Sequence, residues 1–196
     1  MKALRIKIKI AFIICCFSPG LKAQGLSALK PDHAVLQYAG SIGYVSVGLG
    51  YDLFKKKRGS LEFNYGYVPE DKGGTLHIAS TKFAYRPWQI KIKEFATVYP
   101  VNPGVFFSYH FGKQFDIAFD REQYGKSYYG WSTAIRGHIS LSNEIKLYTG
   151  EKKSVTLYSE FNTSDLYLAS MFFKNNRKWL SPQDIVKLGI GLKVGF

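Results

Sequence analysis

Cysteine is scarce in this sequence, and both copies lie near its start. The 196 residues include two cysteines, Cys15 and Cys16, inside a short apolar run. If the first 23 residues are removed on export, the remaining chain has no thiol. This excludes a disulfide framework, a zinc–thiolate site and a cysteine nucleophile from the mature protein.

The amino-terminal segment has the layout of a secretory signal peptide. Basic residues come first, the apolar run 10–17 follows, a Pro-Gly pair ends that run, and Ala23 is a small residue at the expected cut. The run is too short for a membrane-spanning helix, which needs about 20 apolar residues. We therefore expect 1–23 to be a cleaved signal peptide and 24–196 to form a single barrel domain.

Long apolar runs and acidic residues are also rare. No apolar run of 18 residues follows the amino-terminal segment, which argues against transmembrane helices. Lys and Arg number 27 against 14 Asp and Glu, and 22 of the bases remain after the cut, giving a net charge of +8. An exported protein with scattered bases has little use for nucleic acid, so we expect no nucleic-acid partner. Outer-membrane lipid or lipopolysaccharide is the expected neighbour.

Alternation with a period of two is abundant. Between 44 and 54, for example, the odd positions are apolar and most even positions are small or polar. Such segments predict seven β-strands, at 41–54, 59–68, 75–86, 103–112, 128–142, 153–163 and 185–196. A change of phase within 75–86 predicts a bulge or bend in that strand.

The contents of the two faces favour a membrane barrel. A soluble sandwich alternates as well, but here large residues share one face while Gly, Ser and charge share the other, as in small barrels with a polar lumen. Aromatic residues gather where strands meet loops, as in interfacial belts. The predicted fold is all-β, a closed, antiparallel, up-and-down transmembrane β-barrel of eight strands. A soluble sandwich or barrel is the alternative.

The eighth strand follows from parity. Bacterial barrels have an even number of strands, short turns and both termini in the periplasm, and long loops outside. Short connections at 55–59 and 149–153 alternate with longer or more irregular ones at 68–74, 113–127 and 164–184. This places the start of 41–54 outside and requires one more strand, for which we choose 30–40 over 166–173. The stretch 87–102 is long for a periplasmic turn, and its prolines predict irregular structure.

On these features the chain resembles the small eight-stranded bacterial outer-membrane proteins. The resemblance covers the mature length and rests on the signal peptide, the alternating segments and the final apolar positions Ile190, Leu192, Val194 and Phe196. In that class the assembly machinery of the outer membrane recognises a terminal aromatic residue. The resemblance therefore implies this partner for Phe196 and the outer membrane of a Gram-negative cell as the location. The cut before Gln24 and the Tyr, Phe and Lys content are similar to barrels of Bacteroidetes.

One set of residues fits acyl-transfer chemistry. Alternation places His138, Ser140 and Glu160 in the lumen, and His can remove a Ser proton while an acid orients the imidazole. The pair is similar to the His-x-Ser motif of the lipid A 3-O-deacylase barrels, which also carry a Glu. In that family the motif lies on the penultimate strand and faces lipid, whereas His138 lies further upstream and in the predicted lumen.

The alternative for the same residues is a polar network that fills the lumen. Side chains just fill the interior of an eight-stranded barrel, and charges there have to pair, for instance Arg136 with Glu160 or Glu62. We therefore expect an outer-membrane barrel with a structural or loop-mediated binding role and no enzymatic activity. A lipid A or phospholipid acyl hydrolase is the alternative. No cofactor is expected, and His33, His77, His110 and His138 lack the spacing of metal ligands.

Overall fold

A computed structural model describes residues 30–115, 132–150, 153–172 and 181–196. Two compact units are distinguished, Met1–Lys30 and Pro31–Phe196. The expected signal peptide and most of the predicted loop 113–127 lie outside the described residues. All that follows concerns the second unit.

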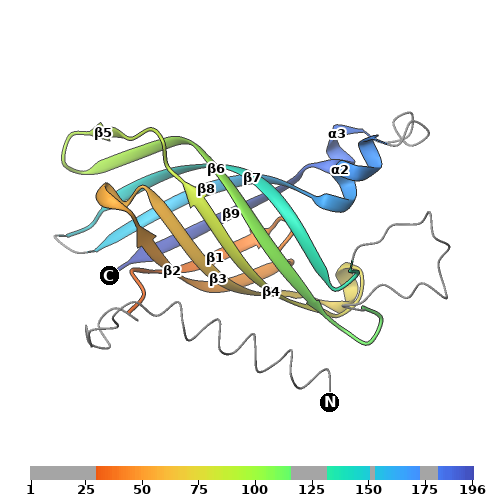
Figure 1. The fold of residues 1–196 in the computed structure, drawn as a ribbon. Coiled ribbons are helices and arrows are strands. Elements are labelled where there is room, and N and C mark those ends of the chain that lie inside the picture. Colours follow the sequence, from red (N-terminus) through yellow and green to blue (C-terminus); the bar gives the residue numbers. More distant parts are fainter. Residues whose placement is uncertain (1–29, 116–131, 151–152, 173–180) are drawn as a thin grey trace, which may run out of the picture. The chain divides into compact units, whose positions relative to one another are not determined.

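This unit is a closed antiparallel barrel of eight strands with one short additional strand (Figure 1). The strands are β1 (His33–Ala39), β2 (Val45–Leu53), β3 (Gly59–Val68), β4 (Leu76–Tyr85), β5 (Ile90–Ile92), β6 (Ala96–Phe111), β7 (Ile135–Tyr148), β8 (Ser154–Ser164) and β9 (Lys187–Gly195). Each barrel strand pairs with its neighbour in sequence, β4 pairing with β6 past the small β5. β1 pairs with β9 and closes the ring, so the predicted fold class is confirmed.

β1 confirms the eighth strand predicted within 30–40. Its register sets Leu36 opposite Val47 on β2 and opposite Leu192 on β9. Of the competing stretch 166–173, residues 166–172 belong instead to the helix α2 (Asp165–Phe172), and 173 lies outside the described residues. The run after Ser164 has apolar residues on adjacent positions rather than alternating ones, and the Ser164 hydroxyl accepts the Tyr167 N–H at its start.

The remaining helices are short and lie between strands. They are η2 (Lys55–Lys57), η3 (Glu70–Lys72) and α3 (Pro182–Ile185). Ser181 precedes α3, and the Asp184 carboxylate within α3 accepts hydrogen bonds from the hydroxyl and the backbone N–H of Ser181, as in a capping box. These bonds lower the pKa of Asp184. Within the described part of the chain, no helix has the length and apolar character that crossing a membrane requires.

Two strand predictions need correction. The strand predicted at 128–142 begins at Ile135 and continues to Tyr148, because outward apolar positions recur at Ile145 and Leu147 beyond the polar stretch at 142–144. The part at 128–131 lies outside the described residues. The strand predicted at 103–112 begins earlier, at Ala96, because the first part of β6 forms a hairpin with β5. The stretch 87–102 is irregular in part, as expected, since residues 87–89 and 93–95 lie outside strands.

The predicted bulge in 75–86 is wrong, because β4 pairs with β3 without a register shift. The change of phase arises because Ile78 is an apolar residue that points into the lumen, where it is 3 % exposed. The bulge lies in β6, between Tyr99 and Asn102 in the pairing with β7. Pro100 lies within this bulge, where a residue without an N–H is tolerated.

The barrel has two different ends, clearly separated in Figure 1. One end, here called the terminal end, carries the start of β1, the end of β9, the turn 54–58 and the β5–β6 hairpin. The other, the loop end, carries the β1–β2 turn, η3, α2 and α3. The connections expected to be short, at 55–59 and 149–153, lie at the terminal end, and the longer ones expected at 68–74 and 164–184 lie at the loop end, where the β1–β2 turn is also short.

The outward and inward faces differ sharply in chemistry. Large apolar side chains face outward on every barrel strand, among them Val47 at 57 %, Phe107 at 64 % and Ile190 at 57 % exposure. Polar and charged side chains are buried inside, including Gln37, Asn64, Ser108, Glu62, Lys82, Glu144, Glu160, Asn162 and Lys193. The barrel is thus apolar outside and polar inside, the reverse of a water-soluble core.

Candidate functional site

Among the described residues, acids and the basic side chains of lysine and arginine are buried in the lumen in equal numbers. The buried acids are Glu62, Glu144 and Glu160, and the buried lysine and arginine side chains are Lys82, Arg86 and Lys193. A charge that leaves water at this depth needs an opposite charge and hydrogen bonds in compensation. The pairing of these six residues therefore determines whether the lumen is stable.

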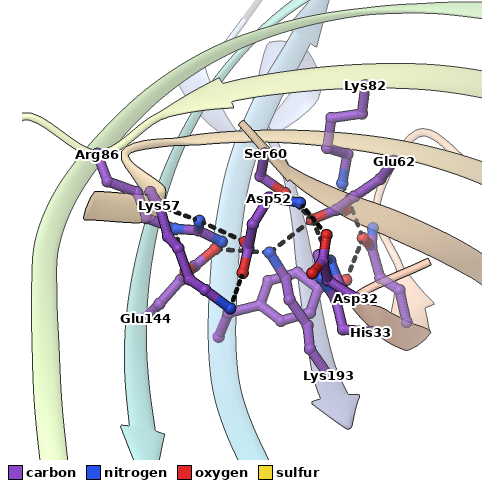
Figure 2. Close-up of polar contacts among 12 residues, drawn as sticks. Asp32, His33, Asp52, Lys57, Ser60, Glu62, Lys82, Arg86, Glu144 and Lys193 are labelled. Carbon is purple, nitrogen blue, oxygen red and sulfur yellow. Dashed lines mark hydrogen bonds and ion pairs between the residues drawn. The ribbon is translucent and has the colours of Figure 1, made fainter. Parts of the chain in front are cut away.

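Lys193 on β9 joins two acids from different strands (Figure 2). Its Nζ donates to Glu62 Oε1 at 2.7 Å and to Glu144 Oε1 at 2.6 Å. The Ser60 hydroxyl donates to the same Glu62 oxygen at 2.9 Å, and His33 Nε2 lies 3.6 Å from it. One ammonium group thus ties β9 to both β3 and β7.

Arg86, directly after β4, extends this cluster to the terminal end (Figure 2). Its Nε donates to Glu144 Oε2 at 2.8 Å, and its Nη1 donates to Asp52 Oδ1 at 3.2 Å. Nη1 also donates to the backbone oxygen of Lys57 at 3.0 Å, while Lys57 Nζ lies 3.2 Å from Asp52 Oδ2. The guanidinium group therefore fixes the turn 54–58 to the ionic cluster.

A second polar layer lies further toward the loop end. Lys82 Nζ lies 2.9 Å from Glu160 Oε2 and donates to Gln37 Oε1 at 3.1 Å. The Tyr158 hydroxyl donates to the same Gln37 oxygen at 2.8 Å. Tyr158 fits because Gly191 faces it from β9: a Cβ at Gly191 would lie 2.4 Å from the tyrosine ring. The tyrosine, the amide and the ion pair together occupy the middle of the lumen.

The network is of the expected kind, but its partners differ from those considered from the sequence. Lys82 holds Glu160, Lys193 holds Glu62, and Arg136 has no ion pair with a described residue. The difference arises because these ion pairs join strands that are not neighbours in the sheet: Lys82 on β4 reaches Glu160 on β8, and Lys193 on β9 reaches Glu62 on β3. Arg86 was missed because it follows the end of β4, where alternation no longer assigns a face. Alternation within 44–54 assigns Asp52 to the polar face but does not identify its partner.

The three residues considered for acyl transfer lie in separate hydrogen-bond systems. His138 Nε2 bonds to the Ser108 hydroxyl at 2.9 Å, and the imidazole stacks on Phe106 with ring centroids 4.2 Å apart. Glu160 is held by Lys82 and accepts a bond from the Asn162 amide. Among described residues, His138 Nδ1 has no hydrogen-bond partner, so no acid orients the imidazole. Ser140 makes no side-chain bond to either of the other two.

The Ser108–His138 pair has little access from outside. Ser108 is 1 % exposed and His138 is 6 % exposed, so a substrate cannot reach the serine without a rearrangement of the lumen. Among the described residues, no carboxylate forms an ion pair or hydrogen bond with the His138 imidazole. The described residues also contain no group of three or more His, Cys, Asp or Glu that could hold a metal ion.

The terminal end opens into a cavity of about 810 Å³, here called the vestibule. Its lining includes the buried Arg86, Glu144 and Lys193, which form its floor, and residues of the rim such as Lys56 in the turn 54–58 and Lys91 in β5. The ionic cluster therefore separates the vestibule from the middle of the lumen. The sequence offered one signal for this site, the basic run 55–58, which was treated only as a short turn.

Comparisons with known proteins give weak likenesses. No protein-family model matches the chain, and no curated protein matches it. Among solved structures, the N-terminal β-barrel domain of Pseudomonas aeruginosa OprF is 12 % identical, covering 85 % of this chain and 98 % of that one, with a TM-score of 0.41. The NanC porin is 8 % identical, covering 84 % and 98 %, with a TM-score of 0.26. At these scores neither likeness bears on activity, and the barrel fold rests on the strand pairing of this chain.

Proposed function

We propose that this chain is an integral outer-membrane protein whose barrel is closed to transport, with a structural or binding role exerted at its ends. The observation that carries the proposal is the distribution of side chains across the wall. Residues such as Leu49, Phe63 and Leu157 are about half exposed on the outside, while six charged side chains are buried inside.

Hydrocarbon outside the barrel explains this distribution. Each Å² of apolar surface left in water forgoes about 25 cal/mol, and monomeric soluble proteins rarely expose continuous apolar patches beyond a few hundred Å². A membrane also requires every backbone N–H and C=O in its core to be paired within the protein. The β1–β9 pairing meets this requirement because it leaves no free edge among the barrel strands.

Aromatic residues at both ends support a membrane position. Tyr38 and Tyr67 are exposed near the loop end, and Tyr85 and Trp88 are exposed near the terminal end. Such amphipathic rings favour the two interfaces of a bilayer. The outward apolar belt between them would contact outer-membrane lipid, and lipopolysaccharide would contact the loop end if that end faces outside.

The orientation and the assembly partner belong to the same proposal. Both ends of the barrel chain lie at the terminal end, which in bacterial barrels faces the periplasm. Phe196 follows β9 with its side chain 49 % exposed, so it is accessible to the assembly machinery that recognises a terminal aromatic residue. In this proposal residues 1–23 direct export and 24–196 form the mature protein.

Cell fractionation of the full chain tests this proposal. The expected result is recovery in the outer membrane, together with faster gel migration of the unheated protein, as tightly closed barrels show. A protein that is released with the soluble periplasmic fraction after cell lysis would contradict the membrane position.

The acyl-hydrolase alternative has its own test. Because His138 bonds to a buried serine and lacks an acid partner, we expect a His138→Ala variant to leave the lipid A and phospholipid composition of the envelope unchanged. Mass spectrometry of lipids from cells that express either protein measures this. A shift in acyl-chain number that depends on His138 would support the enzyme instead.

A further inference from the structure

The vestibule has a large excess of positive charge. Its lining contains eight cationic side chains, Lys56, Lys57, Arg58, Arg86, Lys91, Lys146, Lys153 and Lys193. It contains three acidic side chains, Asp32, Asp52 and Glu144. This differs from the interior beyond its floor, where Lys82 and Glu160 balance each other.

The excess comes from cations that form no ion pair with an acid in the described part of the chain. Lys57, Arg86 and Lys193 are paired with Asp52, Glu62 or Glu144. The other five, Lys56, Arg58, Lys91, Lys146 and Lys153, form no ion pair with a described residue. They come from three separate parts of the rim, the turn 54–58, the β5–β6 hairpin and the region where β7 meets β8. Like charges around one cavity repel, and an anion in the cavity relieves that repulsion.

The backbone of the turn 54–58 is a second, independent observation. Phe54, Lys56 and Lys57 have positive φ values of 65°, 61° and 54°, which side chains other than that of glycine rarely adopt. Strain of this kind is typical of sites where a side chain is needed. Two of these strained residues, Lys56 and Lys57, line the vestibule. The Arg86 guanidinium holds the turn by donating to the Lys57 backbone oxygen.

We propose that the vestibule binds a phosphate-bearing anion. Ammonium groups from several turns can surround one phosphate chain, and Arg58 adds a fork that can bind two phosphate oxygens. The volume of about 810 Å³ is that of a small-molecule site. Two sources offer this chemistry at a periplasmic mouth, a soluble phosphate compound and the head group of a phospholipid. The proposed binding of a phosphate-bearing anion depends only on the charge and the volume of the vestibule. The periplasmic location of the vestibule rests on the proposed function.

Calorimetric titration of the mature protein with sodium tripolyphosphate tests the proposal, in a neutral detergent at low salt. The vestibule variant carries Lys91→Gln, Lys146→Gln and Lys153→Gln. The matched control carries Lys55→Gln, Lys72→Gln and Lys113→Gln, which remove the same charge at exposed positions outside the vestibule. We expect the vestibule variant to bind at least about tenfold more weakly, because it removes three cations that line the cavity. The control should stay within about twofold of wild type, because it lowers the net charge equally but leaves the lining intact.

Two results would overturn the proposal: no measurable binding by the wild-type protein, or an equal loss in both triple variants. Heat-modifiable migration of each variant shows that its barrel is intact, and it also keeps a failure here distinct from a failure of the membrane proposal. Nanodiscs then separate the sources. Phosphatidylcholine is the reference because its choline cation neutralises its phosphate. If phosphatidylglycerol weakens tripolyphosphate binding relative to phosphatidylcholine alone, an anionic lipid head group occupies the site; unchanged binding assigns it to a soluble phosphate compound.

Discussion

At the scale of single residues, the lumen is held by charges that share partners. Lys193 lies between Glu62 and Glu144, and Arg86 lies between Glu144 and Asp52. Removing one member of such a set leaves a buried charge without compensation, which costs far more than the loss of an exposed pair. The position of each cation therefore matters more than the number of ion pairs.

Replacing Lys193 tests this view. We expect Lys193→Met to lower the free energy of unfolding by about 3–5 kcal/mol, because Glu62 and Glu144 would face each other without their shared cation. The control Lys187→Met, on the same strand but only half-buried, should change it by less than about 1 kcal/mol. Urea unfolding in lipid vesicles measures both. Equal, small effects would show that the acids find other partners.

Packing inside the lumen depends on glycines that face large side chains. Gly191 leaves room for Tyr158, and a Cβ there would lie 2.4 Å from the ring. We expect Gly191→Ala to destabilise the barrel by about 1–3 kcal/mol, since Tyr158 must move away from Gln37. The control Gly137→Ala places its Cβ 3.7 Å from Phe107 on the outer face and should be almost neutral. The same unfolding assay compares the two, and a neutral Gly191→Ala would contradict tight packing in the lumen.

At the scale of elements, alternation and parity predicted most of the barrel. The even number of strands required β1, and the structure has it at His33–Ala39. β5 was missed because three residues are too few to establish a period. The bulge was assigned to 75–86 instead of β6 because an apolar residue in the lumen, Ile78, imitates a change of phase. Alternation shows which positions are apolar and which are polar. It shows which side chains face the lumen only where every lumen position is polar, and Ile78 is an exception.

Cross-linking tests the seam that closes the ring. The expected mature chain has no cysteine, so a Leu36→Cys/Leu192→Cys pair has no competing thiol. These positions lie directly opposite each other on β1 and β9. Mild oxidation should join them, whereas Leu36→Cys/Leu188→Cys, displaced by four residues or about 13 Å, should stay reduced. Denaturing gels report the result, and efficient cross-linking of the displaced pair would contradict the register.

At the scale of the whole molecule, the barrel is apolar outside, charged inside and open at one end into a basic vestibule. The first two features could be predicted from the sequence, because they follow from a period of two. The ion-pair partners and the vestibule could not, since they depend on which residues different strands bring to one level of the lumen. Lys193, Glu144 and Glu62 are far apart in sequence and meet only through the register of β9, β7 and β3.

The central claim is that this barrel lies in a membrane and that its ionic cluster closes the lumen. Current recordings of the purified mature protein in planar lipid bilayers test it most directly, with a porin in a separate bilayer of the same composition as the positive control. Because Lys82, Tyr158 and Lys193 bring polar groups from several strands into the lumen, we expect insertion without stepwise current. Reproducible stepwise openings of the wild-type protein would contradict a closed lumen.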